Sequence, residues 1–119
     1  LLKHTNNDFV GVVYRPATVC GFSPRLRLDL SVNILTNHAV SNRVIKVFGG
    51  SQLRPNLHID DYASLCIRLL TADENLVSDQ VFNCGYQNET IMGIAKIVRS
   101  VVQQEMPHLG EIALEVEFQ

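Results

Sequence analysis

The chain has 119 residues, the length of one ordinary domain, so we expect residues 1–119 to form a single domain around one core. Ten lysines and arginines stand against twelve aspartates and glutamates, and this net charge of −2 excludes the basic field that would attract nucleic acid or an anionic membrane. No apolar run is long enough to cross a bilayer and no secretory leader is recognisable, so we expect neither a membrane span nor secretion.

The first quarter of the chain predicts the end of a helix, a strand and a loop. Residues 1–8 are typical of a helix end that runs into a polar turn. Residues 9–14 form a nearly continuous, β-branched apolar run, which predicts a strand buried on both faces of a parallel sheet, and Pro16 stops it. Residues 17–28 predict a loop at the carboxyl end of that strand, where open α/β sheets bind ligands.

The next segment predicts a helix followed by two strands. Apolar residues with helical spacing begin after Asp29, which we take as the N-cap, and the helix is expected to stop near Asn42. Residues 44–48 predict a second strand that ends in a Gly-Gly turn. Residues 53–59 return as a short irregular strand, and Pro55 predicts that it lies at a sheet edge or bulge.

The middle of the chain predicts an amphipathic helix, a loop and a third strand. We expect Asp60 or Asp61 to cap the helix, whose apolar stripe faces a core. Residues 73–78 are polar and predict a loop. Residues 80–84 then form a short apolar strand that Gly85 closes.

The last part of the chain holds the clearest element. Isoleucines and valines recur every three and four residues after Thr90, which predicts a long helix with Thr90 as its N-cap, ended by Pro107 and Gly110. Residues 112–118 alternate strictly between apolar and other residues, which indicates a strand with one wet face. Strands that alternate with helices predict an α/β fold.

Metal chemistry has little support in the sequence. The four histidines have no ligand partners at three or four residues and the cysteines form no CxxC, so we expect no metal site. Cys20, Cys66 and Cys84 are odd in number and lie in apolar surroundings. This usage favours reduced, buried thiols in a cytoplasmic protein.

Arg54 is the most prominent candidate for ligand binding. It lies between a turn and a helix beside apolar residues, where its guanidinium could bind a phosphate or carboxylate with two hydrogen bonds. The alternative is a structural ion pair with Asp60 or Asp61. Two other arginines, Arg25 and Arg27, are expected to be solvated.

The order of three motifs resembles a known family. VVYRPATVCG, then IKVFGGSQLRPNLHIDDYA leading into a helix, then QVFNCG before another helix, resemble the later half of an NAD-dependent epimerase/dehydratase. These enzymes are extended short-chain dehydrogenases/reductases that act on nucleotide sugars, and the resemblance covers residues 9–105. It implies the C-terminal part of a Rossmann-type α/β fold, with mixed short strands and three or four helices.

The resemblance assigns roles to six residues. Arg54 matches the arginine that binds the substrate pyrophosphate, and Asn33 matches a helix position that faces the nucleotide. Thr18 occupies a position that is commonly Asn and that contacts the nucleotide sugar. The loop that closes over the junction of cofactor and sugar contributes the cofactor-binding residues Pro16, Ala17 and Val19.

The family's catalytic motifs are not in these residues. No glycine-rich cofactor turn occurs, and Tyr14, Tyr62 and Tyr86 have no lysine four residues on, so we expect no catalytic residue here. The resemblance implies that NAD or NADP binds mainly to an absent N-terminal half. We therefore expect a substrate-binding portion of a longer enzyme, in agreement with a first residue that is not Met, and we expect it to be inactive alone.

Two alternatives and one assembly state remain open. The chain could belong to a reductase or dehydrogenase with a substrate that lacks a nucleotide, or it could be a non-catalytic binding module of the same fold. The apolar faces of residues 9–14 and of the helix that follows Asp61 would be uncovered without the Rossmann half, so we expect a homo-oligomer.

Overall fold

The computed structural model describes residue 6 and residues 8–117 of the chain. In this part the chain forms seven strands, four α-helices and one 3₁₀ turn, mixed along the sequence as an α/β fold. Their order is β1 (Val13–Pro16), β2 (Thr18–Cys20), α1 (Ser31–Asn42), β3 (Val44–Phe48), β4 (Leu53–His58), α2 (Ile59–Thr71), α3 (Glu74–Val77), β5 (Val81–Cys84), β6 (Gln87–Thr90), α4 (Ile91–Glu105), η2 (Pro107–Leu109) and β7 (Ala113–Glu117).

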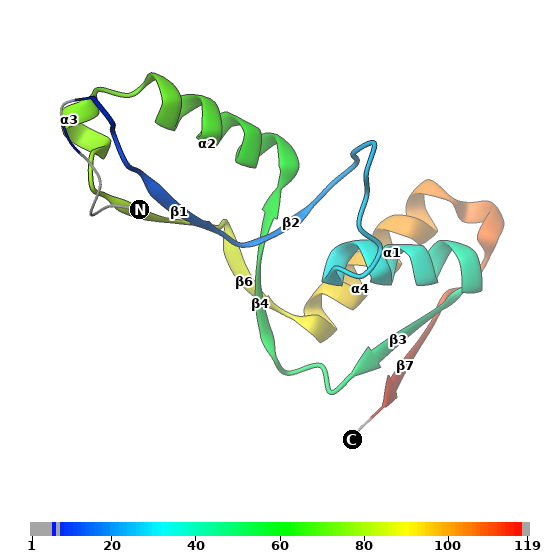
Figure 1. Cartoon of the computed structure of the whole chain (residues 1–119). Coiled ribbons are helices and arrows are strands. Elements are labelled where there is room, and N and C mark those ends of the chain that lie inside the picture. Colours follow the sequence, from blue (N-terminus) through cyan, green and yellow to red (C-terminus); the bar gives the residue numbers. More distant parts are fainter. Residues whose placement is uncertain (1–5, 7, 118–119) are drawn as a thin grey trace.

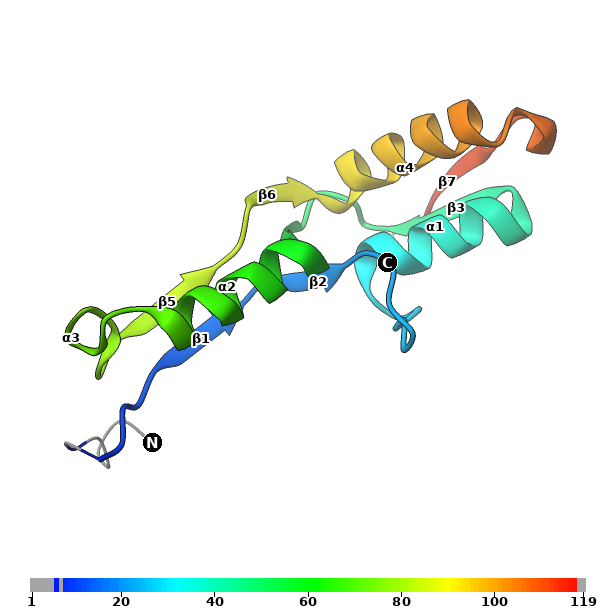
Figure 2. The same ribbon diagram turned by 90° about the horizontal axis from the view of Figure 1, so that it is seen from above.

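The molecule is elongated and has two lobes (Figures 1 and 2). The core lobe consists of α1, α4, β3 and β7, the narrow lobe of α2, α3, β1 and β5, and the bridge sheet of β2, β4 and β6 connects them. The extents are 59 × 31 × 20 Å and the radius of gyration is 18.4 Å. A compact chain of this length would have a radius of gyration of about 14 Å, so much of the surface is not folded back on itself.

The buried core lies in the core lobe. Strand β3 pairs in parallel with β7, and α1 and α4 pack against this pair. The buried side chains follow the helical and strand periods that the sequence shows, because each element turns one apolar face inward. They are Leu35, Ala39, Ile45, Val47, Ile94, Ala95, Val98, Val102 and Ile112.

Strand β4 is the central strand of the bridge sheet, so the predicted edge position of residues 53–59 is wrong. It pairs antiparallel with β6 through Leu53–Asn56 and parallel with β2 through Asn56–His58. Pro55 is tolerated because pairing with β2 begins one residue later, at Asn56. The proline therefore has a neighbouring strand on one side only, and its missing N–H leaves no gap in the ladder to β2.

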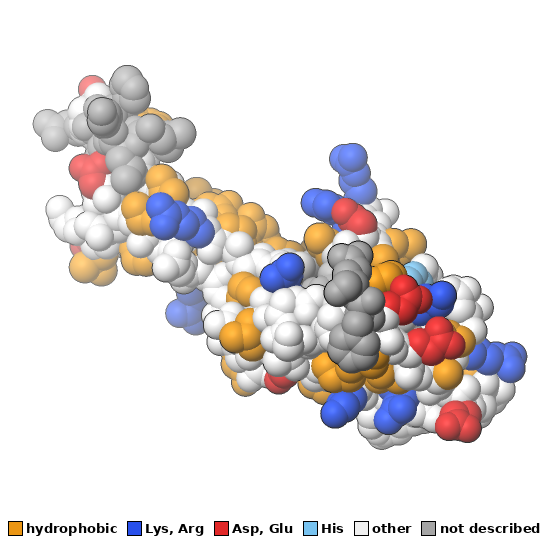
Figure 3. Space-filling model, turned by 90° about the horizontal axis from the view of Figure 1, so that it is seen from below, with side chains coloured by type: hydrophobic (Ala, Val, Ile, Leu, Met, Phe, Trp, Pro, Cys, Tyr) orange, Lys and Arg blue, Asp and Glu red, His pale blue; other side chains and the backbone are white. Residues whose placement is uncertain are grey.

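The narrow lobe is less buried than the sequence predicts. Strand β1 begins at Val13 rather than at residue 9, and among the described residues it pairs only with β5, in parallel. Its Tyr14 side chain is exposed, so the expectation of a strand buried on both faces is wrong here. Helix α2 has no fully buried residue. Figure 3 shows hydrophobic side chains at the surface along much of the length of the molecule.

The helix caps agree with the sequence in one case and differ in two. Thr90 caps α4 as predicted, since its hydroxyl accepts a hydrogen bond of 2.9 Å from the N–H of Gly93. The N-cap of α2 is His58 rather than Asp60 or Asp61, and its ring nitrogen accepts from the N–H of Asp60. Both aspartates instead lie in the first turn, where the helix dipole favours negative charge.

The N-cap of α1 is Leu30, without a side-chain hydrogen bond, rather than Asp29. Short elements also appear inside predicted loops: β2 lies within residues 17–28, and α3 lies within residues 73–78. The predicted helix end at residues 1–8 lies largely outside the described residues.

Candidate functional site

The three predicted substrate-binding residues lie on chain segments that meet at Asn56. Thr18 is opposite Asn56 in the parallel pairing of β2 with β4. The Asn56 side-chain amide donates a hydrogen bond of 3.0 Å to the carbonyl oxygen of Arg54. The Ser31 hydroxyl, at the start of α1, donates to the Asn56 side-chain oxygen over 3.2 Å. Asn56 thus ties β4 to the first turn of α1, which carries Asn33.

Arg54 is exposed on β4, and in the described part of the chain it forms no ion pair. The predicted alternative of a pair with Asp60 or Asp61 is therefore not realised. Its Nη1 donates to the carbonyl oxygen of Leu53 over 3.1 Å. Glu89 is the cross-strand neighbour of Arg54, and its carboxylate accepts from the backbone and hydroxyl of Thr90. The guanidinium is consequently available to an anion from solution.

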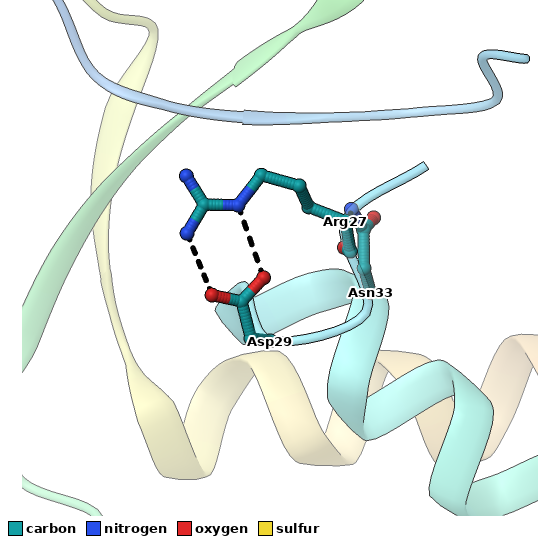
Figure 4. A network of polar contacts seen from close by, with 3 residues as sticks. All are labelled: Arg27, Asp29 and Asn33. Carbon is teal, nitrogen blue, oxygen red and sulfur yellow. Dashed lines mark hydrogen bonds and ion pairs between the residues drawn. The ribbon is translucent and has the colours of Figure 1, made fainter. Parts of the chain in front are cut away.

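Asn33 holds the loop that joins β2 to α1. Its side-chain amide donates a hydrogen bond of 2.8 Å to the carbonyl oxygen of Arg27. The Arg27 guanidinium in turn binds Asp29 with two hydrogen bonds, Nε to Oδ1 at 3.0 Å and Nη2 to Oδ2 at 2.6 Å (Figure 4). Arg27 is thus exposed, as predicted, but it is not free. These hydrogen bonds hold the pKa of the Asp29 carboxyl below its usual value.

A hollow of about 180 Å³ lies under this loop, and we call it the loop hollow. Its walls include Val19 and Asn33, two of the predicted site residues, together with Arg25, Arg27 and Ile59. Gly21, also in the wall, has a φ of +113°, and a Cβ there would lie 2.8 Å from Nε2 of His58. Glycine is required at this position because the chain turns away from β2 directly against the imidazole.

The other predicted cofactor residues line a different hollow, of about 240 Å³, where the parallel strands β1 and β5 end. Pro16 and Ala17 form part of its wall with Pro55 and Gly85. A Cβ on Gly85 would lie 3.2 Å from the Cβ of Ala17, so the glycine keeps this hollow open. The carboxyl ends of parallel strands are where open α/β sheets place their ligands.

Two parts of the site were not predicted from the sequence. Asn56 follows Arg54 by two residues in a strand, so the alternation of side chains places both on one face of β4 and could have identified it. The Arg27–Asp29 pair has no comparable signal, because charged residues two apart in a loop adopt many arrangements.

Within residues 6 and 8–117, no group of three or more histidine, cysteine, aspartate or glutamate side chains could hold a metal ion. The described helices include none that is both long enough and apolar enough to cross a membrane.

Solved structures of other proteins share the fold of this chain. The chain superposes on ADP-L-glycero-D-manno-heptose-6-epimerase from Helicobacter pylori with a TM-score of 0.71 and 26% identity, covering 99% of this chain and 35% of that one. For UDP-glucuronic acid 4-epimerase from Bacillus cereus, solved with UDP-glucuronic acid and NAD, the TM-score is 0.69 and the identity 24%, over 90% of this chain and 31% of that one.

A third structure, dTDP-glucose 4,6-dehydratase from Bacillus anthracis with NAD, has a TM-score of 0.67 and 17% identity, over 90% of this chain and 32% of that one. The chain therefore spans about a third of the length of the solved structures that it resembles. Residues 2–85 match the sequence model of the NAD dependent epimerase/dehydratase family. With most of its length matched and the same fold in these structures, the chain belongs to the NAD dependent epimerase/dehydratase family.

Proposed function

We propose that this chain is the substrate-binding part of an NAD-dependent nucleotide-sugar epimerase or dehydratase, and that it binds the diphosphate of a nucleotide sugar. The observation that carries the proposal is the convergence at Asn56, which brings β2, β4 and the start of α1 together beside an unpaired Arg54. The solved relatives include enzymes named for UDP-glucuronic acid and dTDP-glucose, which supports this class of substrate.

Each polar residue has a role that its chemistry allows. Arg54 binds the pyrophosphate, because a planar guanidinium can donate two parallel hydrogen bonds to phosphate oxygens. The Thr18 hydroxyl contributes a shorter contact than an asparagine would. Asn33 uses its amide nitrogen to hold Arg27, so its side-chain oxygen is the atom left to accept a hydrogen bond from the nucleotide.

The cofactor in this proposal is NAD or NADP, and the chain supplies only part of its wall. Pro16 and Ala17 line the hollow that Gly85 keeps open, and Val19 lines the loop hollow. When bound, the cofactor would accept a hydride from a sugar carbon. Its phosphates must be held elsewhere, because the sequence contains no glycine-rich cofactor turn.

Among the described residues, Tyr14 is not suited to catalytic proton transfer. A hydrogen bond with Tyr62, over 3.2 Å between the hydroxyl oxygens, and a further contact with Cys66 raise the pKa of Tyr14. A catalytic tyrosine must instead be able to lose its proton near neutral pH. We therefore expect the chain alone to show neither NAD reduction nor sugar epimerisation, and turnover by the purified chain would contradict the proposal.

Nucleotide binding tests the proposal directly. Titration calorimetry of the 119-residue chain with UDP-, dTDP-, ADP- and GDP-sugars should show binding to at least one of them. Arg54→Ala should weaken this binding about 10- to 100-fold, because a charge-assisted hydrogen bond contributes about 1.5–3 kcal/mol. Arg68→Ala, an exposed arginine on α2, is the matched control and should bind as the wild type does.

The same titration separates the alternative functions. Affinity that is unchanged by Arg54→Ala for every nucleotide would favour a reductase or dehydrogenase with a substrate that lacks a nucleotide.

The protein is expected to act in the cytoplasm. Its cysteines Cys20, Cys66 and Cys84 are free thiols, which suit a reducing environment.

A further inference from the structure

The Arg27–Asp29 ion pair does not fasten the loop to any other element. Its two residues are two positions apart, and their side chains are 66% and 65% exposed. An exposed pair of this kind contributes little to stability, because water solvates both charges well. The bidentate geometry nevertheless holds the Arg27 guanidinium in one place and gives it a negative partner.

The backbone of Arg27 is tied to another element, whereas its guanidinium is held by an exposed residue of the same loop, Asp29. The hydrogen bond from the Asn33 amide to the Arg27 carbonyl oxygen anchors this residue on α1, at the rim of the loop hollow (Figure 4). A long arginine side chain on an anchored backbone can exchange one carboxylate partner for another anion without moving the loop. Asn33 is therefore a positioning residue for Arg27.

The charge of the loop hollow indicates what it would attract. Its walls carry two arginines, Arg25 and Arg27, and no aspartate or glutamate. Apart from Asn33, the other wall residues are apolar or small, and they include Val19, Leu30 and Ile59. At about 180 Å³ the hollow is smaller than a typical ligand pocket, so it suits a phosphate-sized group rather than a whole nucleotide.

We propose that Arg27 is a second residue that binds the diphosphate of the substrate. Asp29 competes with the diphosphate for the Arg27 guanidinium, and the diphosphate must displace it. This inference rests on the proposed function, since it assigns the loop hollow to the same diphosphate that Arg54 binds. The exchange involves no covalent step: one bidentate ion pair opens and another forms. Asp29 thereby lowers the affinity for weakly charged ligands and favours those with a doubly charged group.

The signs of the mutational effects distinguish a competitor from a merely structural pair. Asp29→Asn removes the competing charge, so UDP and inorganic pyrophosphate should bind up to about fivefold more tightly, a small factor because the exposed pair is weak. Arg27→Gln should weaken the binding of both UDP and pyrophosphate about tenfold. The double variant should bind like Arg27→Gln, because Asp29 acts only through Arg27.

The experiment is isothermal titration of the full 119-residue chain and its variants with UDP, inorganic pyrophosphate and uridine, with Arg68→Gln as the control. Uridine should show none of the changes, since it carries no phosphate. Binding that Asp29→Asn leaves unchanged or weakens, or that Arg27→Gln leaves unchanged, would overturn the proposal. Circular dichroism spectra identical to wild type would show that these exposed substitutions preserve the fold.

The outcomes also separate this inference from the proposed function. If Arg54→Ala weakens UDP binding while the Arg27 and Asp29 variants leave UDP affinity unchanged, the proposed competition by Asp29 is wrong and the proposed function stands. If Asp29→Asn strengthens UDP binding only when Arg27 is present, while Arg54→Ala has no effect, the diphosphate binds in the loop hollow and the proposed role of Arg54 is wrong. Failure of wild type and Asp29→Asn to bind UDP or pyrophosphate would overturn both.

Discussion

At the scale of single residues, the Asp29 carboxylate has a titration that reports its partner. Hydrogen bonds from Arg27 favour the charged form, so the pKa of folded Asp29 lies below its usual value of 3.8. Because the folded pKa is depressed, the stabilisation is present above the unfolded pKa and is lost as the pH falls through the folded pKa. The change of stability with pH is therefore confined to acid conditions, and it is small because both side chains are exposed.

A carbon-detected NMR titration of the Asp29 side chain checks this expectation. Wild type should titrate below 3.8, and Arg27→Gln should return the midpoint toward that value. An Asp29 midpoint that is the same with and without the arginine would contradict the ion pair.

At the scale of elements, two isoleucines show how differently the core lobe and the narrow lobe are buried. Ile45 on β3 is 0% exposed, whereas Ile67 on α2 is 63% exposed. Ile45→Ala should therefore lower the free energy of unfolding by about 2–5 kcal/mol, through lost burial and a residual cavity. Ile67→Ala is the matched control and should change it by less than about 0.5 kcal/mol.

Urea denaturation at low protein concentration measures both variants. Equal losses in the free energy of unfolding for Ile45→Ala and Ile67→Ala would mean that α2 is covered in solution. This result would bear directly on the assembly of the chain.

At the scale of the whole molecule, the elongated shape leaves apolar side chains of the narrow lobe uncovered. Ile67, Leu70 and Leu76 are 63%, 86% and 72% exposed, and Phe9 and Tyr14 are also exposed. Apolar side chains exposed in such number favour association. We therefore expect the purified chain to form homo-oligomers through the narrow lobe.

Sedimentation over a range of concentrations tests this expectation. Wild type should associate as its concentration rises, and Leu70→Glu should shift the equilibrium toward monomer by placing a charge on the apolar surface. Ser100→Glu, an exposed position on α4 in the core lobe, is the control and should behave as wild type. A wild-type chain that stays monomeric at high concentration would contradict the prediction.

Local sequence patterns determined much of this fold. The period of the long helix α4, its Thr90 cap, strand β3 and the alternating strand β7 were all predicted, because each depends on residues close together in the chain. The ordered motifs around Arg54 identified the family, which the match over residues 2–85 confirms. The roles of Arg54, Asn33 and Thr18 remain proposals.

Only the tertiary structure decided how these pieces meet. The central position of β4 depends on β2 and β6, which lie on either side of it in the chain, and Pro55 by itself indicated an edge. The contact between Ser31 and Asn56 joins residues 25 positions apart, and the tie between Arg27 and Asn33 depends on how a glycine-containing loop returns to α1. Periodicity shows which face of an element is apolar, but partners and register are set by pairing between distant segments.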